Sequence, residues 1–245
     1  MKKEIIRLDT TTSTSDVLKA HPTPAPGTMT VAVAAYQTHG RGQARNTWES
    51  ERGKNLLMSI LTGSVGIAAN RQFVLSMAGA LALKDAMGHL TDGISLKWPN
   101  DIYWRDRKLS GTLIEASLAG RSIQRCIYGI GLNVNQRVFT GDAPNPVSLY
   151  NITGRETPTE HVLDLVLDCF ENYYQLATGG GERQIADEYN ASLFWRDGIH
   201  QFEDTATHTP FMASISHVGC DGLLHLALTD GTERQYALKE VRFCI

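Results

Sequence analysis

The chain has 245 residues, of which 42% are hydrophobic and 20% are charged, so it can form one large domain, or a domain plus a small module, with a sizeable core. Its formal net charge of −3 at pH 7 gives no general attraction to nucleic acid or to an anionic membrane, and we expect neither as a partner. The four cysteines form no C-x-x-C pair and no apolar run is long enough for a signal core or a membrane span, which favours a cytoplasmic protein with reduced thiols.

The first predicted elements surround a run of hydroxyl residues. Residues 5–8 are predicted as a strand, and the run at 10–15 precedes a short helix at 16–20. Serine and threonine oxygens at a helix start can cap free backbone amides or bind a ligand, and the sequence leaves both roles open. After an extended connection rich in proline, the valine- and alanine-rich residues 30–37 predict a buried strand that ends at Gln37.

The next stretch, Gly40 to Trp48, carries two glycines, two arginines and one large aromatic residue between two predicted strands. Glycine lets a backbone approach a ligand closely, and an arginine can grip a phosphate or carboxylate through two hydrogen bonds. The stretch lacks the Walker A and G-x-G-x-x-G patterns. It is therefore predicted to be an anion-binding loop, with a solvated loop as the alternative; His39 before it is interpreted as a polar loop residue.

Alternating buried elements continue through the middle of the chain. Residues 55–62 predict another buried strand, and 71–90 have the apolar spacing of an amphipathic helix. Strands are expected at 112–116 and 123–130, the second leading into the glycine-rich residues 129–135. Glycines at a strand end leave room for a ligand, although a β-bulge or close helix packing would also use them.

The segment Lys97-Trp98-Pro99-Asn100-Asp101 lies between that helix and those strands. It has the highest concentration in the chain of residues that are costly to bury or constrain. Proline restricts the preceding residue to an extended conformation and sets a corner of a turn, while asparagine tolerates a positive φ at the next corner. Apolar runs on both sides predict a hairpin, and a second turn at 105–106 then delivers Lys108. Cations beside a carboxylate could hold a phosphorylated or carboxylated ligand, or could form a solvated surface cluster.

The patterns in the last third of the chain predict structural elements rather than ligand-binding residues. Residues 157–160 predict a capping box with proline at the first helical position, and the following helix is expected to bury Val162, Val166, Phe170 and Tyr173 and to end at three glycines, 179–181.

Beyond Trp195 short strand patterns are separated by two Asp-Gly pairs, at 221–222 and 230–231, which predict hairpins in a small β barrel. The histidines of this part, His208, His217 and His225, lack the tight spacing of a metal site and are interpreted as surface residues.

Taken together, the charged stretches resemble the motifs of biotin protein ligases. That family carries a G-R-G-x-x-x-x-x-W loop, a K-W-P-N-D turn, a lysine seven residues after the aspartate, and G-I-G-x-N; here they are Gly40 to Trp48, Lys97 to Asp101, Lys108, and Gly129 to Asn133. The resemblance implies an α+β fold, with a catalytic domain like that of class II aminoacyl-tRNA synthetases at 1–195, a mixed sheet with flanking helices, and an SH3-like β barrel at 196–245. It also implies a form without an N-terminal DNA-binding domain, because the first ligand motif already lies at Ser13.

The same resemblance implies the site. Biotin would lie against Ser13, Thr14, Ser15, Gln37, Gly40, Arg41, Gly42, Gln43, Lys108 and Gly111, and Trp48, Asn100, Gly129, Gly131 and Asn133 would border the nucleotide or leave room for it. Two positions depart from the family pattern. Ser15 stands where the family has asparagine, and Ala44-Arg45 stands where it has arginine then glycine. No contact is assigned to Arg45 or Asn46, and no residue is assigned as a metal ligand.

The implied reaction uses ATP, biotin and Mg²⁺ to make biotinyl-AMP and then transfers biotin to a lysine of a biotin carboxyl carrier protein. A fixed cation helps most where negative charge builds, so Lys108 is expected to bridge the biotin carboxylate and the α-phosphate. Arg41 is expected to hold the adenylate, Asp101 to orient or deprotonate the acceptor lysine, and Lys97 to support Asp101. A homodimer is left open by the sequence.

Three other functions stay in view. A lipoate or octanoate protein ligase or transferase shares the architecture, although the Trp-containing loop and the Lys-Trp-Pro-Asn-Asp turn favour biotin. A DNA-binding repressor has no support from charge. A non-catalytic biotin-binding protein is kept open by Ser15 and Ala44.

Overall fold

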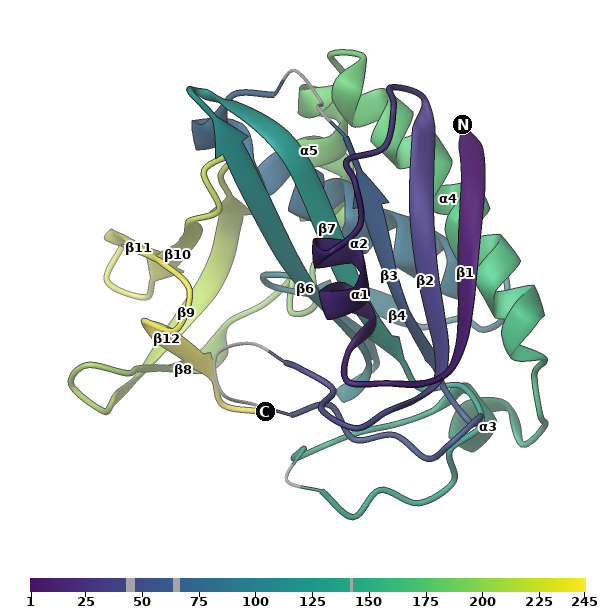
Figure 1. Ribbon diagram of the computed structural model, residues 1–245. Helices are drawn as coiled ribbons and strands as arrows, with labels where there is room; N and C mark the ends of the chain where they lie inside the picture. Colours follow the sequence, from purple (N-terminus) through teal and green to yellow (C-terminus); the bar gives the residue numbers. More distant parts are fainter. Residues whose placement is uncertain (43–46, 64–66, 142) are drawn as a thin grey trace.

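The protein is built on two β-sheets, as a computed structural model that describes residues 1–42, 47–63, 67–141 and 143–245 shows (Figure 1). The larger sheet has seven strands. In order across the sheet they are β1 (Lys2–Thr11), β2 (Thr28–Gln37), β3 (Leu56–Thr62), β7 (Ser122–Leu132), β6 (Arg107–Ala119), β5 (Asp101–Trp104) and β4 (Ile94–Lys97). Strands β1 and β2 are parallel and the other pairs are antiparallel, so the mixed sheet and the α+β class are confirmed.

Helices cover the two faces of this sheet unequally. The short helix α1 (Thr14–Lys19) connects β1 to β2 and packs on β2, β3 and β7. On the opposite face lie α2 (Phe73–Gly88), α4 (Thr159–Thr178) and α5 (Glu182–Ala191), as Figure 1 shows. Because α1 covers only part of its face, the ends of β2, β6 and β7 stay open on that side, where the site is built.

Helix α2 corrects the sequence prediction. It was expected to be amphipathic, but residues 74–83 are all buried, with Val74, Leu75, Met77, Leu81 and Leu83 at most 1% exposed. A helix that is apolar all round is buried, and α2 lies between the sheet and helices α4 and α5. The apolar spacing in the sequence identified only one buried face. The alanines between the larger apolar residues of α2 are core residues too.

Helix α4 begins without the predicted capping box. Pro158 is its N-cap and makes no side-chain capping bond within the described residues, and Glu160 pairs instead with Arg7 of β1. Tyr174 rather than Tyr173 lies in the core at 8% exposed, because Tyr173 turns its hydroxyl outward, toward Asp85. The helix ends at the first of the three glycines, as expected.

A capping box does form in the loop before α4. The short helix α3 (Leu149–Thr153) starts at Ser148, whose hydroxyl accepts a hydrogen bond from the Asn151 backbone N–H at 3.1 Å. The sequence analysis predicted neither α3 nor α5. Both are short enough that tertiary contacts, rather than intrinsic helix propensity, decide whether they form.

The C-terminal part forms a five-stranded antiparallel sheet. In spatial order its strands are β11 (Glu233–Tyr236), β10 (Leu224–Leu228), β9 (Thr209–Val218), β8 (His200–Asp204) and β12 (Val241–Phe243). Both predicted Asp-Gly hairpins are confirmed, with Gly222 and Gly231 at φ values of 90° and 86°. This sheet lies to the left of β6 in Figure 1.

Residues 193–195 join the two sheets. Leu193 forms a parallel bridge with Leu96 of β4, and the next residue donates its backbone N–H to the Leu96 carbonyl at 2.8 Å. Trp195 stacks on His200 and on Phe243, with ring centroids 4.4 and 5.5 Å apart. The division of the chain at 195/196 stays a prediction, since the aromatic contacts at that point are continuous.

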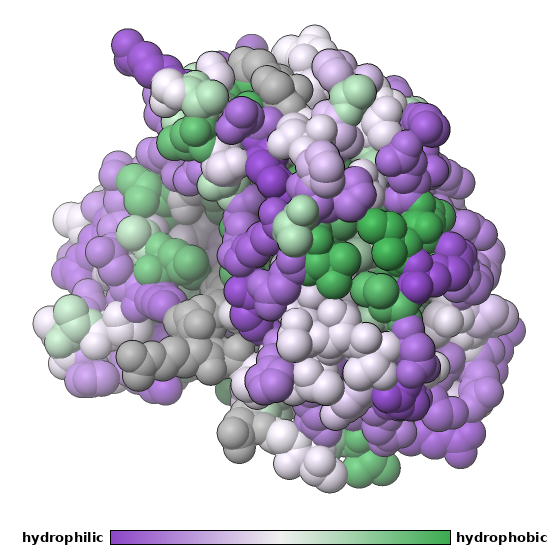
Figure 2. All heavy atoms as spheres, in the orientation of Figure 1, coloured by the Kyte–Doolittle hydropathy of each residue, from purple (hydrophilic) through white to green (hydrophobic). Residues whose placement is uncertain are grey.

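The surface seen from the α1 side is uneven in character. Figure 2 shows apolar residues gathered over the β1 and β2 part of this face, with hydrophilic residues around them. Ile5 of β1 is one of the exposed large apolar residues, at 36%. Within the described ranges, none of the helices combines the length and the apolar character needed to cross a membrane.

Candidate active site

A cavity of about 510 Å³ opens beside α1, between the ends of the large sheet's strands and the loops that follow them. Its volume is in the range of small-molecule sites. Most of the predicted site residues line it: Ser13, Thr14, Ser15, Gln37, Arg41, Gly42, Trp48, Asp101, Lys108, Gly111, Gly129, Gly131 and Asn133. Gly40 and Asn100 are not among its lining residues, and Gln43, with Ala44, Arg45 and Asn46, lies outside the described residues.

The β4–β5 hairpin carries Asp101, one of the two acidic residues that line the described part of the cavity. Its turn contains a cis peptide bond between Trp98 and Pro99, and Asn100 keeps a negative φ, so the left-handed corner expected there is instead found at Arg105 in the following turn. Trp98 is 5% exposed and donates its ring N–H to the Gly222 carbonyl at 3.0 Å. The burial of Trp98 and its bond to Gly222 hold the hairpin against the C-terminal sheet.

Asn100 supports this hairpin and does not face the cavity. It is 6% exposed, and its Nδ2 donates to the Thr112 carbonyl of β6 at 2.6 Å. The predicted nucleotide contact at Asn100 therefore has no support from the cavity lining. A buried amide that bridges two strands holds Asp101, the next residue, at a fixed place relative to β6.

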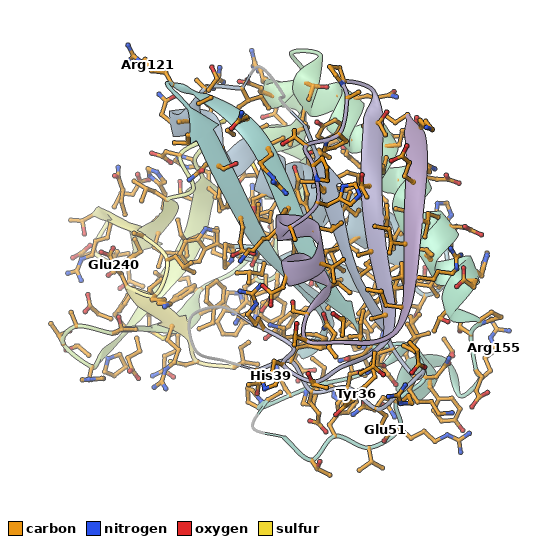
Figure 3. The ribbon with its side chains drawn as sticks, in the orientation of Figure 1. Tyr36, His39, Glu51, Arg121, Arg155 and Glu240 are labelled. Carbon is orange, nitrogen blue, oxygen red and sulfur yellow. The ribbon has the colours of Figure 1, made fainter. Side chains whose placement is uncertain are left out.

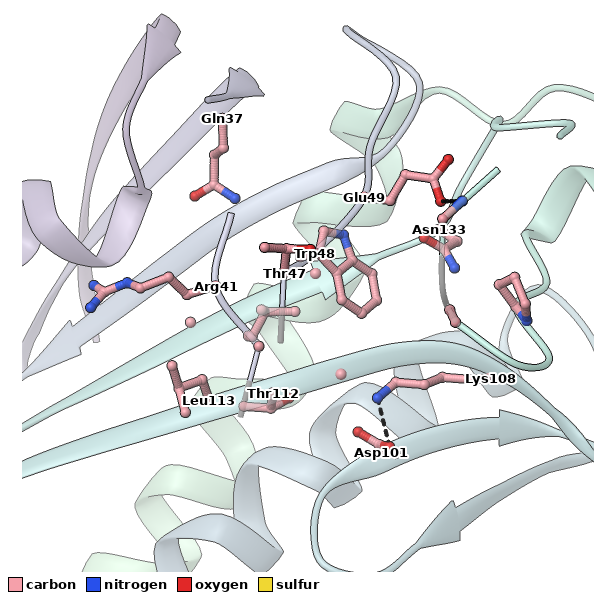
Figure 4. Close-up of a pocket in the computed structure, with 18 of the residues that line it drawn as sticks. Gln37, Arg41, Thr47, Trp48, Glu49, Asp101, Lys108, Thr112, Leu113 and Asn133 are labelled. Carbon is pink, nitrogen blue, oxygen red and sulfur yellow. Dashed lines mark hydrogen bonds and ion pairs between the residues drawn. The ribbon is translucent and has the colours of Figure 1, made fainter. Parts of the chain in front are cut away.

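Asp101 and Lys108 form an ion pair across β5 and β6. The Lys108 Nζ lies 2.7 Å from the Asp101 Oδ2, with the two side chains 30% and 21% exposed (Figure 4). The register brings them together because Tyr103 is paired with Lys108 and a bulge follows Ile102. The Lys108 cation and the Asp101 carboxylate, which the sequence assigned to separate steps, are therefore paired with each other in the free protein.

Lys97 was expected to support Asp101; it lies opposite Asp101 in the register of β4 and β5, and its ammonium also packs on two aromatic rings. Its ammonium lies 5.2 Å from the ring centre of Tyr103 and 5.1 Å from that of Phe243. Burial lowers the pKa of Lys97; the nearby Asp101 raises it, and the charge of Lys108 adds to the lowering. Lys97 thus packs between the hairpin and β12 of the second sheet, while Lys108 is the ion-pair partner of Asp101.

The floor of the cavity is made of glycines on β6 and β7. A Cβ at Gly131 would lie 2.3 Å from the Trp48 ring, and one at Gly111 would lie 3.2 Å from both Trp48 and Lys108. The Lys108 Nζ lies 6.0 Å from the centre of the Trp48 ring. Because Gly131 and Gly111 have no Cβ, the Trp48 ring can lie against the backbone of β6 and β7, and the Lys108 ammonium can come close to Gly111.

At the other side of the cavity, hydroxyl groups gather on α1. Ser13 occupies the N-cap position of α1 but makes no side-chain capping bond within the described residues. Thr14 and Ser15 instead contact the buried Ser59 hydroxyl of β3 at 2.7 and 2.9 Å. Gln37 Oε1 accepts the backbone N–H of Thr14 at 2.7 Å. Of the two roles left open for this run, capping is not used, and the hydroxyls build the cavity wall.

The Ser15 hydroxyl also explains why a third position of the cavity, residue 129, is glycine. A Cβ at Gly129 would lie 2.6 Å from the Ser15 Oγ. The sequence analysis missed Ser59, although a serine inside the otherwise apolar strand β3 was a signal for it. Ser59 is fully buried, and the large majority of buried side-chain polar groups have a hydrogen-bond partner.

The loop from Gly40 to Trp48 is closed at its base by backbone contacts. The Trp48 N–H donates to the Gly40 carbonyl at 3.0 Å, and Arg41 forms a bridge with Thr47. Gly40 is needed because a Cβ there would lie 2.8 Å from the Trp48 carbonyl oxygen. The Arg41 guanidinium lines the cavity but is paired with Asp16 of α1, its side chain 37% exposed.

Glu49, directly after this loop, was not predicted. Its carboxylate accepts the backbone N–H groups of Thr140 and Gly141 at 2.9 and 2.7 Å (Figure 4). Burial alone would raise the pKa of Glu49, but these bonds and those from the side chains of Thr140 and Gln136 outweigh it and lower the pKa. Sequence reasoning had no signal for this clamp, because its partners lie about ninety positions further along the chain.

Further lining residues supply an apolar wall that the motifs did not include. They are Met58 of β3, Leu113 of β6, Ile130 of β7 and Phe139 of the following loop. His39 is exposed and does not line the cavity; its Nδ1 lies 2.9 Å from the Thr38 Oγ1, and Figure 3 shows it near Tyr36 at the end of β2. His39 is a polar loop residue, as interpreted from the sequence.

The arrangement combines three chemical surfaces in one cavity. Hydroxyls and an amide line one side, apolar side chains form a wall, and a lysine–carboxylate pair lies beside an indole on glycine-rich strands. Such a cavity can take an organic acid with an apolar body and present a fixed cation to its carboxylate.

Comparison with known proteins gives a consistent result. The model of the biotin/lipoate A/B protein ligase family matches residues 7–133. The biotin–[acetyl-CoA-carboxylase] ligase of Paracoccus denitrificans is 35% identical over 64% of this chain and 68% of its own length. The bifunctional ligase/repressor BirA of Bacillus subtilis is 32% identical over 85% of this chain, and the chain spans 64% of the length of that relative.

A solved structure extends the likeness to the whole chain. The biotin protein ligase from Aquifex aeolicus in complex with biotin and ATP superposes with a TM-score of 0.78 at 24% identity, covering 98% of this chain and 99% of that one. At this level of identity the match is one of fold, and it includes the C-terminal sheet.

Proposed function

The chain belongs to the biotin/lipoate A/B protein ligase family, and we propose that it is a biotin protein ligase that activates biotin with ATP and transfers it to a lysine of a carrier protein. The observation that carries the proposal is the Asp101–Lys108 pair beside Trp48 on the glycines of β6 and β7. A carboxylic acid must gain a leaving group before an amine can displace it, and a fixed cation at a glycine-lined cavity is suited to that step.

In the first half-reaction, a biotin carboxylate oxygen attacks the α-phosphorus of ATP. The new bond gives biotinyl-AMP, and pyrophosphate leaves with the electron pair of the broken phosphoanhydride bond. Lys108 would stabilise the charge shared between carboxylate and α-phosphate, for which it must move from Asp101. The hydroxyls of Thr14 and Ser15, held by Ser59, would bind the polar end of the biotin ring system.

We include Mg²⁺ with the nucleotide. When bound, the ion neutralises phosphate charge and favours the departure of pyrophosphate. Magnesium prefers oxygen ligands, and water and phosphate groups supply most of them, so the protein needs to offer few. Asn133 fits this need: its Oδ1 is buried in the cavity wall without a hydrogen-bond partner among the described residues, while its amide nitrogen donates to the Val147 carbonyl at 3.1 Å.

In the second half-reaction, the ε-amine of the carrier lysine attacks the carbonyl carbon of biotinyl-AMP, the amide bond forms and AMP leaves. The amine must be uncharged to attack. Once Lys108 contacts the adenylate, the Asp101 carboxylate would be free to orient the incoming ammonium and take its proton. Arg41 would leave Asp16 to hold the adenylate until the carrier binds.

The remaining parts of the proposal concern the setting of this activity. We propose a biotin carboxyl carrier domain as the acceptor, a cytoplasmic location in line with the four free cysteines, and no part for nucleic acid. For the fold, we propose a class II synthetase-like domain at 1–195 and an SH3-like barrel at 196–245. A homodimer is also proposed, through the exposed edge of β1; light scattering during gel filtration tests it.

One assay tests the function. The pure chain is incubated with ATP, Mg²⁺, biotin and a biotin carrier domain, and the carrier is weighed by mass spectrometry. We expect one biotinyl group on one lysine, and biotin-dependent exchange between ATP and labelled pyrophosphate. Exchange that depends on lipoate would assign the protein to the lipoate branch of its family, whereas biotin binding without exchange would make it a non-catalytic binding protein.

A further inference from the structure

Two histidines and one carboxylate meet on the outer part of the C-terminal sheet, far along the chain from the residues that line the cavity. The ligand atoms of His217, His225 and Glu233 all lie within 4.8 Å of one another. The cavity lining extends only to Pro146, so this cluster is separate from the proposed active site. The sequence analysis interpreted both histidines as surface residues because their spacing is not that of a metal motif.

Strand register is what brings the three side chains together. His225 of β10 lies directly opposite His217 of β9, and its partner on the other side is Gln235 of β11. Glu233 is two residues from Gln235 on β11, so it lies on the same face of the sheet, diagonal to His225. Long side chains on diagonal positions can reach each other, and one residue from each of three strands therefore points to one place.

The observed contacts confirm this geometry. The imidazole rings of His217 and His225 are stacked with centroids 3.9 Å apart. The Nδ1 of His225 lies 3.0 Å from the Glu233 Oε1, and the Nδ1 of His217 lies 3.2 Å from the Ser216 hydroxyl. The His225 side chain is only 12% exposed, so it is held in place, while Glu233 is 47% exposed and can adjust.

We propose that His217, His225 and Glu233 form a binding site for a divalent transition-metal ion of the zinc, nickel or copper class. Two imidazoles and one carboxylate are a ligand set that such ions favour, with further positions left to water. Bonds of about 2.0–2.2 Å need ligand atoms closer together than those here, and the stacked imidazoles must turn their nitrogens toward one ion. His217 and Glu233 are both exposed, so their side chains can turn to make these bonds.

The bound ion would fasten three strands to one another. Strand β11 has four residues and forms one edge of its sheet. A short edge strand is the part of a sheet that opens first, and a metal that bridges β9, β10 and β11 would oppose this opening. The site is therefore expected to stabilise the C-terminal sheet without contributing to biotin transfer.

The test uses the full chain, purified without a histidine tag, freed of metal with EDTA and titrated with Zn²⁺ in a calorimeter. We expect one Zn²⁺ per chain and a higher Tm in its presence. His217→Asn and Glu233→Gln should each weaken binding by more than about tenfold, since even outer-shell partners of a metal site contribute that much. The control is His208→Asn, in the turn between β8 and β9 and 82% exposed, which should bind Zn²⁺ as the wild type does.

Two results would overturn the proposal. One is a wild-type chain that binds no stoichiometric Zn²⁺, and the other is equal binding by the wild type and by both His217→Asn and Glu233→Gln. His217 and Glu233 are exposed, so these variants should fold; melting curves in EDTA that match the wild type verify this. Biotin-dependent pyrophosphate exchange should be unchanged in both, which separates this test from that of the proposed function.

Discussion

The two charged segments of the cavity are held in place in different ways. The Lys97–Asp101 hairpin is anchored by buried contacts: Trp98 to Gly222, Asn100 to Thr112, and the Tyr189 hydroxyl to the Pro99 carbonyl at 2.7 Å. The described ends of the Gly40–Trp48 loop are held by backbone bonds at its base and by partly exposed side-chain contacts.

These loop contacts are of a kind that can be exchanged. The Arg41–Asp16 pair is 37% and 46% exposed, and exposed ion pairs contribute little to stability. The groups proposed for chemistry are therefore on a rigid frame, whereas Arg41, proposed to retain the intermediate, has a partner that it can release and regain. Variants in the hairpin should alter chemistry or folding, and variants around the loop should alter retention.

The largest effect is expected for Lys108→Ala. Loss of the cation at the position of developing charge should lower biotin-dependent ATP–pyrophosphate exchange by about 10²–10³-fold. The measurement is exchange of labelled pyrophosphate at saturating biotin. Lys54→Ala, which removes an exposed lysine paired with Glu156, should keep wild-type exchange. Equal exchange in Lys108→Ala and the wild type would remove Lys108 from the first step.

Asp101→Asn tests whether the hairpin also serves the second step. The variant keeps the shape of the side chain and loses its charge, so transfer from preformed biotinyl-AMP to the carrier should fall about 10²-fold. The rate of single-turnover transfer measures it, with the exposed turn residue Asp106→Asn as control. Normal transfer by Asp101→Asn would exclude the role in orienting or deprotonating the amine.

Asn100→Ala tests the rigidity of the frame. Its amide bridges the hairpin and β6, and removal leaves the Thr112 carbonyl without that donor in a buried setting. The free energy of unfolding should fall by about 1–3 kcal/mol. Urea unfolding followed by circular dichroism measures this. The exposed Asn172→Ala on α4 should unfold as the wild type does, and an equally stable Asn100→Ala would show that the hairpin does not need this bond.

Glu49→Gln acts on the loop side. It weakens acceptance from the Thr140 and Gly141 N–H groups, and at about 1 kcal/mol for a hydrogen bond the release of biotinyl-AMP should become about fivefold faster. Because the pKa of Glu49 is lowered, its contribution is complete above the ordinary value of 4.5 and is lost as the pH falls through the lowered pKa. In stopped-flow measurements, release of biotinyl-AMP from the wild type should therefore become faster as the pH falls below 4.5 and through the lowered pKa, whereas release from Glu49→Gln should not change over that range.

The smallest effect is expected for Asp16→Asn. It frees Arg41 from an exposed pair worth about 0–1 kcal/mol, so the affinity for biotinyl-AMP should rise by less than about fivefold. Calorimetric titration with biotinyl-AMP checks the sign. Weaker binding would mean that the Asp16–Arg41 pair positions the loop for the ligand rather than competing with it.

Local sequence patterns were enough to predict where most strands of the large sheet lie, the Asp-Gly hairpins and the glycine-rich places where a ligand could approach. Short-range signals were enough for these: apolar runs for β2 and β3, Asp-Gly pairs for the turns of the C-terminal sheet, and the order and spacing of the motifs for the family. Local patterns also predicted the turn at Arg105 and the end of β2 at Gln37. The resemblance to a known family, rather than local patterns, predicted which residues would meet in one site, and many of these line the cavity.

Tertiary structure decided which side chains are partners. Lys108 forms the ion pair with Asp101, Glu49 reaches Thr140 and Gly141, and residues 74–83 of helix α2 are all buried. The same is true of His217 and His225, which are stacked only because β9 and β10 take one particular register. Register and burial depend on contacts between residues far apart in the chain, and local patterns in a sequence carry no record of those contacts.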